Sequence, residues 1–155
     1  METCISMMKD IAICQLFENQ VEKAPETIAL IEEISKKSKC TLTFDGLLSG
    51  EEFIRFLQSC DIGLSTQVPD AEFNETSFPS KILSYLANGL CVVSVRMKAL
   101  EASEISHLLH YYDENAPDVI AGVIKSIDFS KNIDARTKLQ SLDKKFIQDI
   151  AELTK

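Results

Sequence analysis

The sequence has little basic charge, no long hydrophobic run and no paired cysteine motif. Its 155 residues carry a net charge of -8, and no basic cluster is longer than Lys36-Lys37. A nucleic-acid backbone is therefore an unfavourable partner. No apolar run approaches the roughly 20 residues of a membrane-spanning helix, and the residues after Met1 lack the basic-then-apolar order of a signal peptide. With 45% hydrophobic and 26% charged residues, the chain is typical of a soluble globular protein.

The five cysteines are odd in number, and no two form a CxxC pair. Four of them lie among apolar neighbours, as buried free thiols do. This pattern disfavours a disulfide framework or a zinc site and favours a cytoplasmic location. His107 and His110 lack a third ligand nearby, so we interpret them as structural or surface residues and predict no metal site. Tyr111 and Tyr112 fit half-buried strand aromatics better than a base-stacking platform.

Short apolar runs alternate with helical patterns along the chain. We predict strands at residues 11–17, 40–46, 61–67, 91–95 and 107–113. Predicted helices cover 25–38, 49–60, 79–88, 116–127 and 135–153, with a weaker one at 100–105. Strands separated by helices imply βαβ units. The predicted fold class is α/β: a doubly wound, Rossmann-like parallel sheet flanked by helices, with a C-terminal amphipathic helix, in one domain spanning residues 1–155.

Several boundary and packing features are expected. Ser49 and Glu52 form a capping-box pattern, and Asp45-Gly46 predicts a turn. In the first helix we expect one apolar stripe. Its members are Ile28, Ile31 and Ile34. The last helix also has an apolar face, which we expect to pack on the domain or on a partner domain. Its members are Leu139, Leu142, Phe146, Ile150 and Leu153.

In doubly wound sheets, ligands bind beyond the carboxyl ends of the strands. The candidate loops therefore follow Phe17, Phe44, Thr66, Val95 and Tyr112. The loop after Thr66 leads into the predicted helix 79–88.

That helix has two predicted faces. Its core stripe is Ile82, Tyr85, Leu86 and Gly89, and its other face carries Lys81, Ser84 and Asn88. A helix start with hydroxyls and one cation suits a phosphate. The alternative is that Ser77 only caps the helix, Lys81 is solvated and residues 74–77 are ordinary loop polars.

The stretch "SFPSKILSYLANGLCVVS", preceded by "DGLLSGEEFIRFLQ" and "CDIGLS", resembles the C-terminal half of two-domain glycosyltransferases of the B type (GT-B), especially glycosyltransferase family 4. The likeness covers about residues 40–127, and "FPSKILSYLANG" is its most specific part. The resemblance implies a nucleotide-sugar-binding domain. Such a domain is the donor half of a hexosyltransferase-like enzyme, which moves sugar from a nucleotide-diphospho-sugar to a glycan or lipid-linked acceptor in cell-envelope polysaccharide biosynthesis. No cofactor beyond this donor substrate is implied.

The family's functional positions carry over one by one. Members typically have two glutamates eight residues apart, and these align with Thr76 and Ser84, while Glu75 stands one residue before the first. The intervening loop approaches the phosphates and the sugar, and Lys81 is a hypothetical phosphate contact. The implied nucleotide-sugar-binding residues are Glu75, Thr76, Ser77, Phe78, Pro79, Ser80, Lys81 and Ser84. The catalytic residues stay unassigned.

The chain also departs from the family. The basic pair near the first strand is replaced by a displaced Lys23, and the glycine-rich turn after a second strand is missing. We expect a separate acceptor-binding domain or subunit, and any peripheral membrane association, to come from outside these residues. The isolated chain is expected to be inactive. The alternative function is a catalytically silent α/β module that binds a nucleotide or a protein partner.

Overall fold

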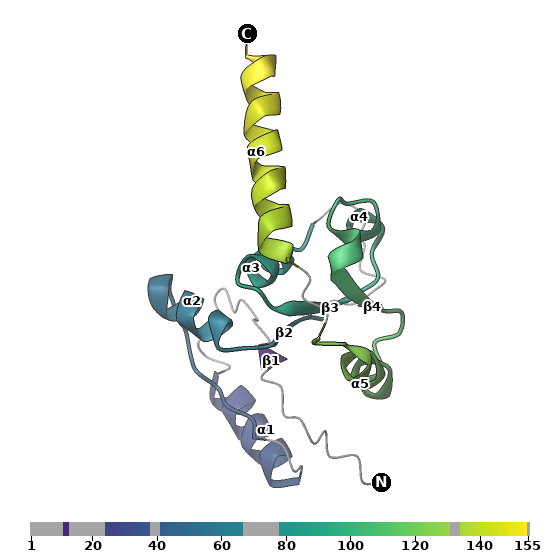
Figure 1. Ribbon diagram of the computed structural model, residues 1–155. Helices are drawn as coiled ribbons and strands as arrows, with labels where there is room; N and C mark the ends of the chain where they lie inside the picture. The colour runs from purple at the N-terminus through teal and green to yellow at the C-terminus, as the bar shows by residue number, and fades with distance from the viewer. Residues whose placement is uncertain (1–10, 13–23, 38–40, 67–77, 131–133, 155) are drawn as a thin grey trace.

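The computed structural model describes residues 11–12, 24–37, 41–66, 78–130 and 134–154. Within them, four strands form one parallel sheet in the order β1-β2-β3-β4 (Figure 1). The strands are β1 (Ile11–Ala12), β2 (Ile62–Ser65), β3 (Cys91–Val95) and β4 (Leu109–Tyr112). The strand prediction at 91–95 is thus confirmed with its bounds, and those at 61–67 and 107–113 are confirmed with shorter bounds. The prediction at 11–17 is met by the two residues of β1, and its remaining residues lie outside the described ranges.

The helices cover both faces of this sheet, as expected for parallel strands buried on both sides. They are α1 (Ala24–Lys37), α2 (Gly50–Gln58), α3 (Lys81–Ala87), α4 (Lys98–Glu101), α5 (Pro117–Ser126) and α6 (Ala135–Leu153), with a 3-10 turn, η3, at Ser106–Leu108. In Figure 1, α3 and α4 lie above the sheet and α5 lies below it. The chain is therefore an α/β domain with a parallel sheet flanked by helices and a C-terminal helix. None of the helices in the described ranges is long and apolar enough to cross a membrane.

The core lies between β2, β3, β4 and the helices that follow them. Its largest fully buried side chains are Tyr85, Tyr112, Leu57, Ile62, Ile82, Leu86, Leu100, Val92, Val93 and Val95. The register pairs Gly63 with Val92 and Val92 with Leu109. Because successive strand residues point to opposite faces, these three residues share one face. This face carries α3, since a Cβ built on Gly63 would lie 2.4 Å from Cγ of Tyr85.

The predicted strand at 40–46 is wrong for the residues that the structure describes. Residues 41–46 have no regular secondary structure, and Leu42 and Phe44 are 41% and 40% exposed. Leu42 N donates to Ser35 Oγ, at the end of α1, instead of to a neighbouring strand. β-branched and aromatic residues favour a strand only where another strand offers hydrogen bonds and packing. At the predicted turn, Gly46 has a φ of 73°, a conformation that favours glycine, but residues 41–49 contain no assigned turn.

Helix ends differ in detail from the expected capping. Ser49 is the N-cap of α2, but its side chain makes no capping hydrogen bond, so the expected capping box is not formed. In α6 the capping residue is Asp134, whose side chain accepts a hydrogen bond from Thr137 N at 3.0 Å. Hydrogen bonds from Thr137 lower the pKa of Asp134, because they stabilise the carboxylate. The α6 bounds agree with the predicted 135–153.

Helix α1 exposes most of the apolar stripe that the sequence predicts to be buried. Ile28 and Ile34 are 38% and 43% exposed, and Leu30 is 55% exposed. Only Ile31 within the stripe is half-buried. In contrast, α2 contributes a fully buried side chain, Leu57, to the core.

Gly63→Ala should destabilise the domain, because the added methyl group would collide with the buried ring of Tyr85. We expect a loss of about 1–3 kcal/mol in the free energy of unfolding, as for an overpacked core. Gly122→Ala is the matched control, since a Cβ there meets no atom within 4 Å. It lies in α5 and should stabilise the domain by roughly 0.5–1 kcal/mol. Urea denaturation of both variants checks this, and equal effects would contradict the close contact.

Candidate functional site

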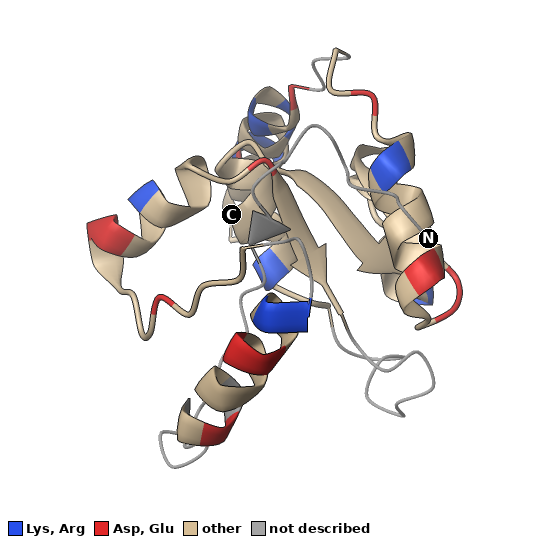
Figure 2. Ribbon diagram, turned by 90° about the horizontal axis from the view of Figure 1, so that it is seen from below, with Lys and Arg blue, Asp and Glu red and all other residues tan. Residues whose placement is uncertain are grey.

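The carboxyl ends of β2, β3 and β4 meet at one edge of the sheet, where the sequence predicts a ligand. Strands β2, β3 and β4 contain no Lys, Arg, Asp or Glu, and Figure 2 accordingly shows them in tan. Charges at this edge come from residues that follow the strands directly. Arg96 follows β3 and Asp113 follows β4. Because Val95 pairs with Tyr112, the register brings these two residues together.

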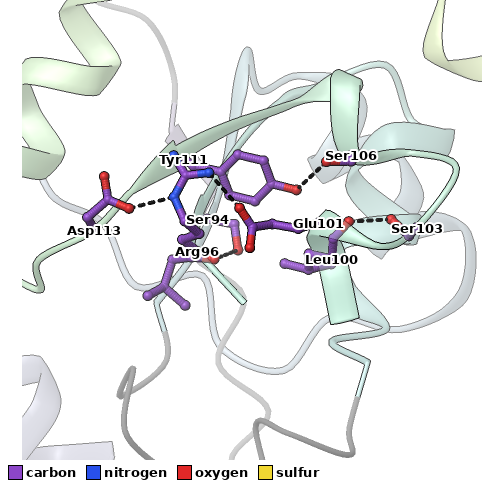
Figure 3. Close-up of polar contacts among 9 residues, drawn as sticks. Ser94, Arg96, Leu100, Glu101, Ser103, Ser106, Tyr111 and Asp113 are labelled. Atoms are coloured by element: carbon purple, nitrogen blue, oxygen red, sulfur yellow. Dashed lines mark hydrogen bonds and ion pairs between the residues drawn. The ribbon is translucent and has the colours of Figure 1, made fainter. Parts of the chain in front are cut away.

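Arg96 is the centre of a polar cluster that the sequence analysis missed (Figure 3). Its Nε forms an ion pair with Asp113 Oδ1, and its Nη1 lies 2.9 Å from Glu101 Oε1. The guanidinium carbon lies 4.8 Å from the centroid of the Tyr111 ring. Ser106 Oγ in turn lies 3.2 Å from the Tyr111 hydroxyl. One side chain thus joins the end of β3, helix α4 and the end of β4.

The charges of this cluster indicate a structural role, in which Arg96 holds α4 and the ends of β3 and β4 together (the Arg96 clamp). The hydrogen bond with Asp113, followed by the one with Glu101, raises the pKa of Arg96. The carboxylates of Asp113 and Glu101 already balance the positive charge of the Arg96 guanidinium. Arg96 therefore has no excess positive charge with which to bind a phosphate. In the sequence, this cluster is indicated only by the positions of Arg96 and Asp113, which lie at the carboxyl ends of two predicted strands. The register between the two strands cannot be read from the sequence.

The predicted binding helix keeps the two faces that the sequence assigns to it. Ile82 and Tyr85 are fully buried and Leu86 is 1% exposed, whereas Ser84 is exposed and Lys81 is half-buried. The core stripe is therefore confirmed over these three residues. Gly89 does not belong to it, because it lies beyond the end of α3 with a φ of 87° and is exposed.

The start of α3 differs from the prediction. The helix begins at Lys81, and its N-cap is Ser80, whose side chain makes no capping hydrogen bond. Pro79 precedes the cap and is buried, and its carbonyl accepts from Ile82 N at 3.0 Å. Phe78 is 39% exposed. The predicted site residues Glu75, Thr76 and Ser77 lie outside the described residues.

Asn88 belongs to the opposite edge of the sheet and not to the site. It is the C-cap of α3, its Nδ2 donates to the Ser84 carbonyl, and its Oδ1 accepts from Gln58 Nε2 at 3.2 Å. Its own carbonyl accepts from Arg136 Nη2 at 2.8 Å. The residue therefore joins α2, α3 and α6.

Two serines and a tyrosine contribute buried polar groups near the carboxyl edge. Ser65 and Ser94 are 4% and 0% exposed and are paired in register. Ser94 Oγ donates to the Val95 carbonyl, and the Tyr112 hydroxyl donates to the Ser65 carbonyl at 3.4 Å. Tyr112 is thus a buried structural aromatic, and Tyr111 is the half-buried residue that stacks on Arg96.

Comparison of the chain with protein-family models, with curated proteins and with solved structures gave no match.

In the part of the chain that the structure describes, no three His, Cys, Asp or Glu side chains are grouped so that they could hold a metal ion. His107 lies in η3 and is exposed, while His110 lies on β4. The candidate groups at this edge are therefore the polar residues of α3, because Arg96 is already paired with Asp113 and Glu101.

His110 should make stability depend on pH below neutrality. Burial lowers its pKa below the ordinary 6.5, so the unfolded chain binds more protons than the folded one in the window just under that value. The stability contribution of neutral His110 is present above about pH 6.5 and is lost as the pH falls. Urea midpoints of the wild type should therefore drop between about pH 7.5 and 5.5, and His110→Gln should flatten this slope. His107→Gln, at an exposed site, is the control, and equal slopes in all three chains would contradict the assignment.

Proposed function

We propose that the chain is the donor-binding half of a glycosyltransferase. It holds a nucleotide-diphospho-sugar whose sugar passes to a glycan or lipid-linked acceptor, in cell-envelope polysaccharide biosynthesis. The support is the resemblance of residues 40–127 to the donor domain of GT-B enzymes, with its most specific block on α3. The acceptor half would come from another domain or subunit.

The observation that carries the proposal is the orientation of α3. Its buried side holds Ile82 and Tyr85, while Ser84, the position aligned with the family's ribose-binding glutamate, is exposed. Lys81 lies one turn nearer the carboxyl edge and is half-buried. A hydroxyl at Ser84 can accept or donate a hydrogen bond to ribose, and a cation one turn away suits the diphosphate.

The strand order fits a doubly wound, Rossmann-like sheet. In the sheet order 3-2-1-4-5-6 of such folds, strands 1, 4, 5 and 6 are consecutive neighbours. We propose that β1, β2, β3 and β4 are these four strands. The switch point, where ligands bind, would then lie between β1 and β2, and α3 is the described helix that follows β2 along the chain.

In this function the chain's own groups stabilise the leaving diphosphate. Phe78, Pro79 and Ser80 shape the segment that approaches the phosphates, and Lys81 supplies the positive charge. Charge stabilisation of this kind is worth several kcal/mol in a site that excludes water. The mechanism assigned by the resemblance is that of retaining enzymes, and it uses backbone N–H groups and side-chain cations for this purpose.

Isothermal titration tests the proposal directly. UDP, GDP and their sugars are titrated into the chain, and saturable binding of one of them is expected. The second candidate, a catalytically silent α/β module, is favoured by Ser84 in place of a glutamate and by the neutralised Arg96 at the site edge. Absence of binding by all these ligands would favour that module as a protein-binding unit.

Lys81→Ala should weaken binding of the nucleoside diphosphate by at least about tenfold, because a charged hydrogen bond contributes roughly 1.5–3 kcal/mol. Binding of the corresponding nucleoside should change little. Lys125→Ala, at the far end of α5, is the matched control. Equal losses for nucleoside and diphosphate would remove Lys81 from the phosphate role.

Ser84→Glu should strengthen nucleotide binding, because a carboxylate accepts a stronger hydrogen bond from ribose than a hydroxyl does. The expected gain is about tenfold. Fold stability should change by less than about 0.5 kcal/mol, since Ser84 is exposed. Ala87→Glu places the same charge on an exposed position one turn further from the site and should bring no gain. Weaker binding by a folded Ser84→Glu chain would count against this placement.

A further inference from the structure

The second half of α6 leaves the domain. The first turns are attached to it, because Ala135 is buried, Arg136 bonds to the Asn88 carbonyl, and Lys138 Nζ lies 3.2 Å from Glu104 Oε2. Leu139 and Leu142 are partly buried against the core. Beyond them the helix stands out from the body of the protein, with its C-terminus at the far end (Figure 1).

The apolar stripe of α6 continues along this projecting part. Phe146, Ile150 and Leu153 are 64%, 46% and 83% exposed, and Ile147 beside them is 59% exposed. Leu139, Leu142, Phe146, Ile150 and Leu153 follow one another at intervals of three or four residues. At 3.6 residues per turn they form one straight stripe. The apolar stripe that packs on the domain at Leu139 and Leu142 therefore continues beyond the domain. No described residue covers this distal part.

The charges beside the stripe are ordered along the helix. Taking 100° per residue, Lys145, Asp149 and Glu152 lie on the same flank of the stripe, with the cation first and the acids last. This order opposes the helix dipole, which favours acids at the start and cations at the end. All three side chains are exposed, and none forms an ion pair with another described residue. Lys145 and Asp149 stand at the i,i+4 spacing without forming an ion pair, so their charges are open to a contact outside the helix.

We propose that this face binds the same face of a second copy of the chain, with the two α6 helices antiparallel. In an antiparallel pair, the flank that carries Lys145, Asp149 and Glu152 lies against the same flank of the second copy, with the order of the residues reversed. The register that sets Phe146 against Ile150 of the second copy also sets Lys145 near Glu152. In a parallel pair this flank would instead face the opposite flank of the second copy, so Lys145 and Glu152 would not meet. The two-fold symmetry of such a contact closes the assembly at a dimer.

The size of the face sets the strength of this dimer. Only about three turns of each helix are free, so the buried area stays well below the roughly 1,600 Å² of standard stable complexes. We therefore expect a weak dimer that forms over about 1 µM to 1 mM, the range of affinities for small interfaces. This inference does not depend on the proposed function.

Sedimentation equilibrium of the full chain over that concentration range tests the proposal. The wild type should pass from monomer to dimer, and Ile150→Glu should raise the dissociation constant by at least about tenfold, because it places a charge at the centre of the contact. Gln148→Glu adds the same charge on the opposite face of α6 and should dimerise like the wild type. Circular dichroism checks that both variants stay folded, which is expected because Glu is a good helix former.

Charge exchange tests the antiparallel arrangement. Lys145→Glu and Glu152→Lys should each weaken the dimer several-fold, and the double variant should restore it, because the opposite charges then meet again across the pair. A double variant as weak as the single ones would overturn the antiparallel pairing. A wild type that stays monomeric throughout would overturn the proposal itself. So would a monomer that binds anionic phospholipid vesicles through α6.

Discussion

The close contact between β2 and α3 determines how the rest of the domain is arranged. Gly63 has no side chain, and the ring of Tyr85 occupies the space that a Cβ would need. Tyr85 is fully buried there, together with Ile82. Because helix positions three and four apart share a face, this contact turns Ser84 away from the core. The absence of one side chain in a strand thus sets which face of α3 is open to a ligand.

A second constraint acts at the neighbouring strands. β3 and β4 carry no charged residue, yet Arg96 joins their ends through Asp113 and connects them to Glu101 of α4. The Arg96 N–H also donates to the Tyr112 carbonyl at 3.0 Å, so backbone and side chain hold the same position. The carboxyl edge is therefore held together by Arg96 on the β3-β4 side, and the candidate ligand groups belong to the β2-α3 side.

The sequence predicted the elements whose signals are local. Helix α6 and strand β3 were found with their bounds, because apolar spacing and flanking residues mark them. The strand at 40–46 was wrong, since strand formation depends on a partner that composition does not reveal. The α3 face was predicted from spacing alone. The Arg96 clamp was not, because Arg96 and Asp113 are 17 residues apart and meet only through the β3-β4 register.

The exposed face of α3 and the exposed stripe of α6 are separated by one junction. Asn88 and Gly89 lie at the end of α3, on the edge opposite Lys81, and Arg136 of α6 donates to the Asn88 carbonyl. A Cβ on Gly89 would lie 3.4 Å from Arg136 Nε, and its positive φ suits glycine. This junction fixes the direction in which α6 leaves the domain. Since Ser84 lies on α3 and Phe146 lies on the distal part of α6, a substitution on the distal stripe is expected to leave the exposed face of α3 around Ser84 unchanged.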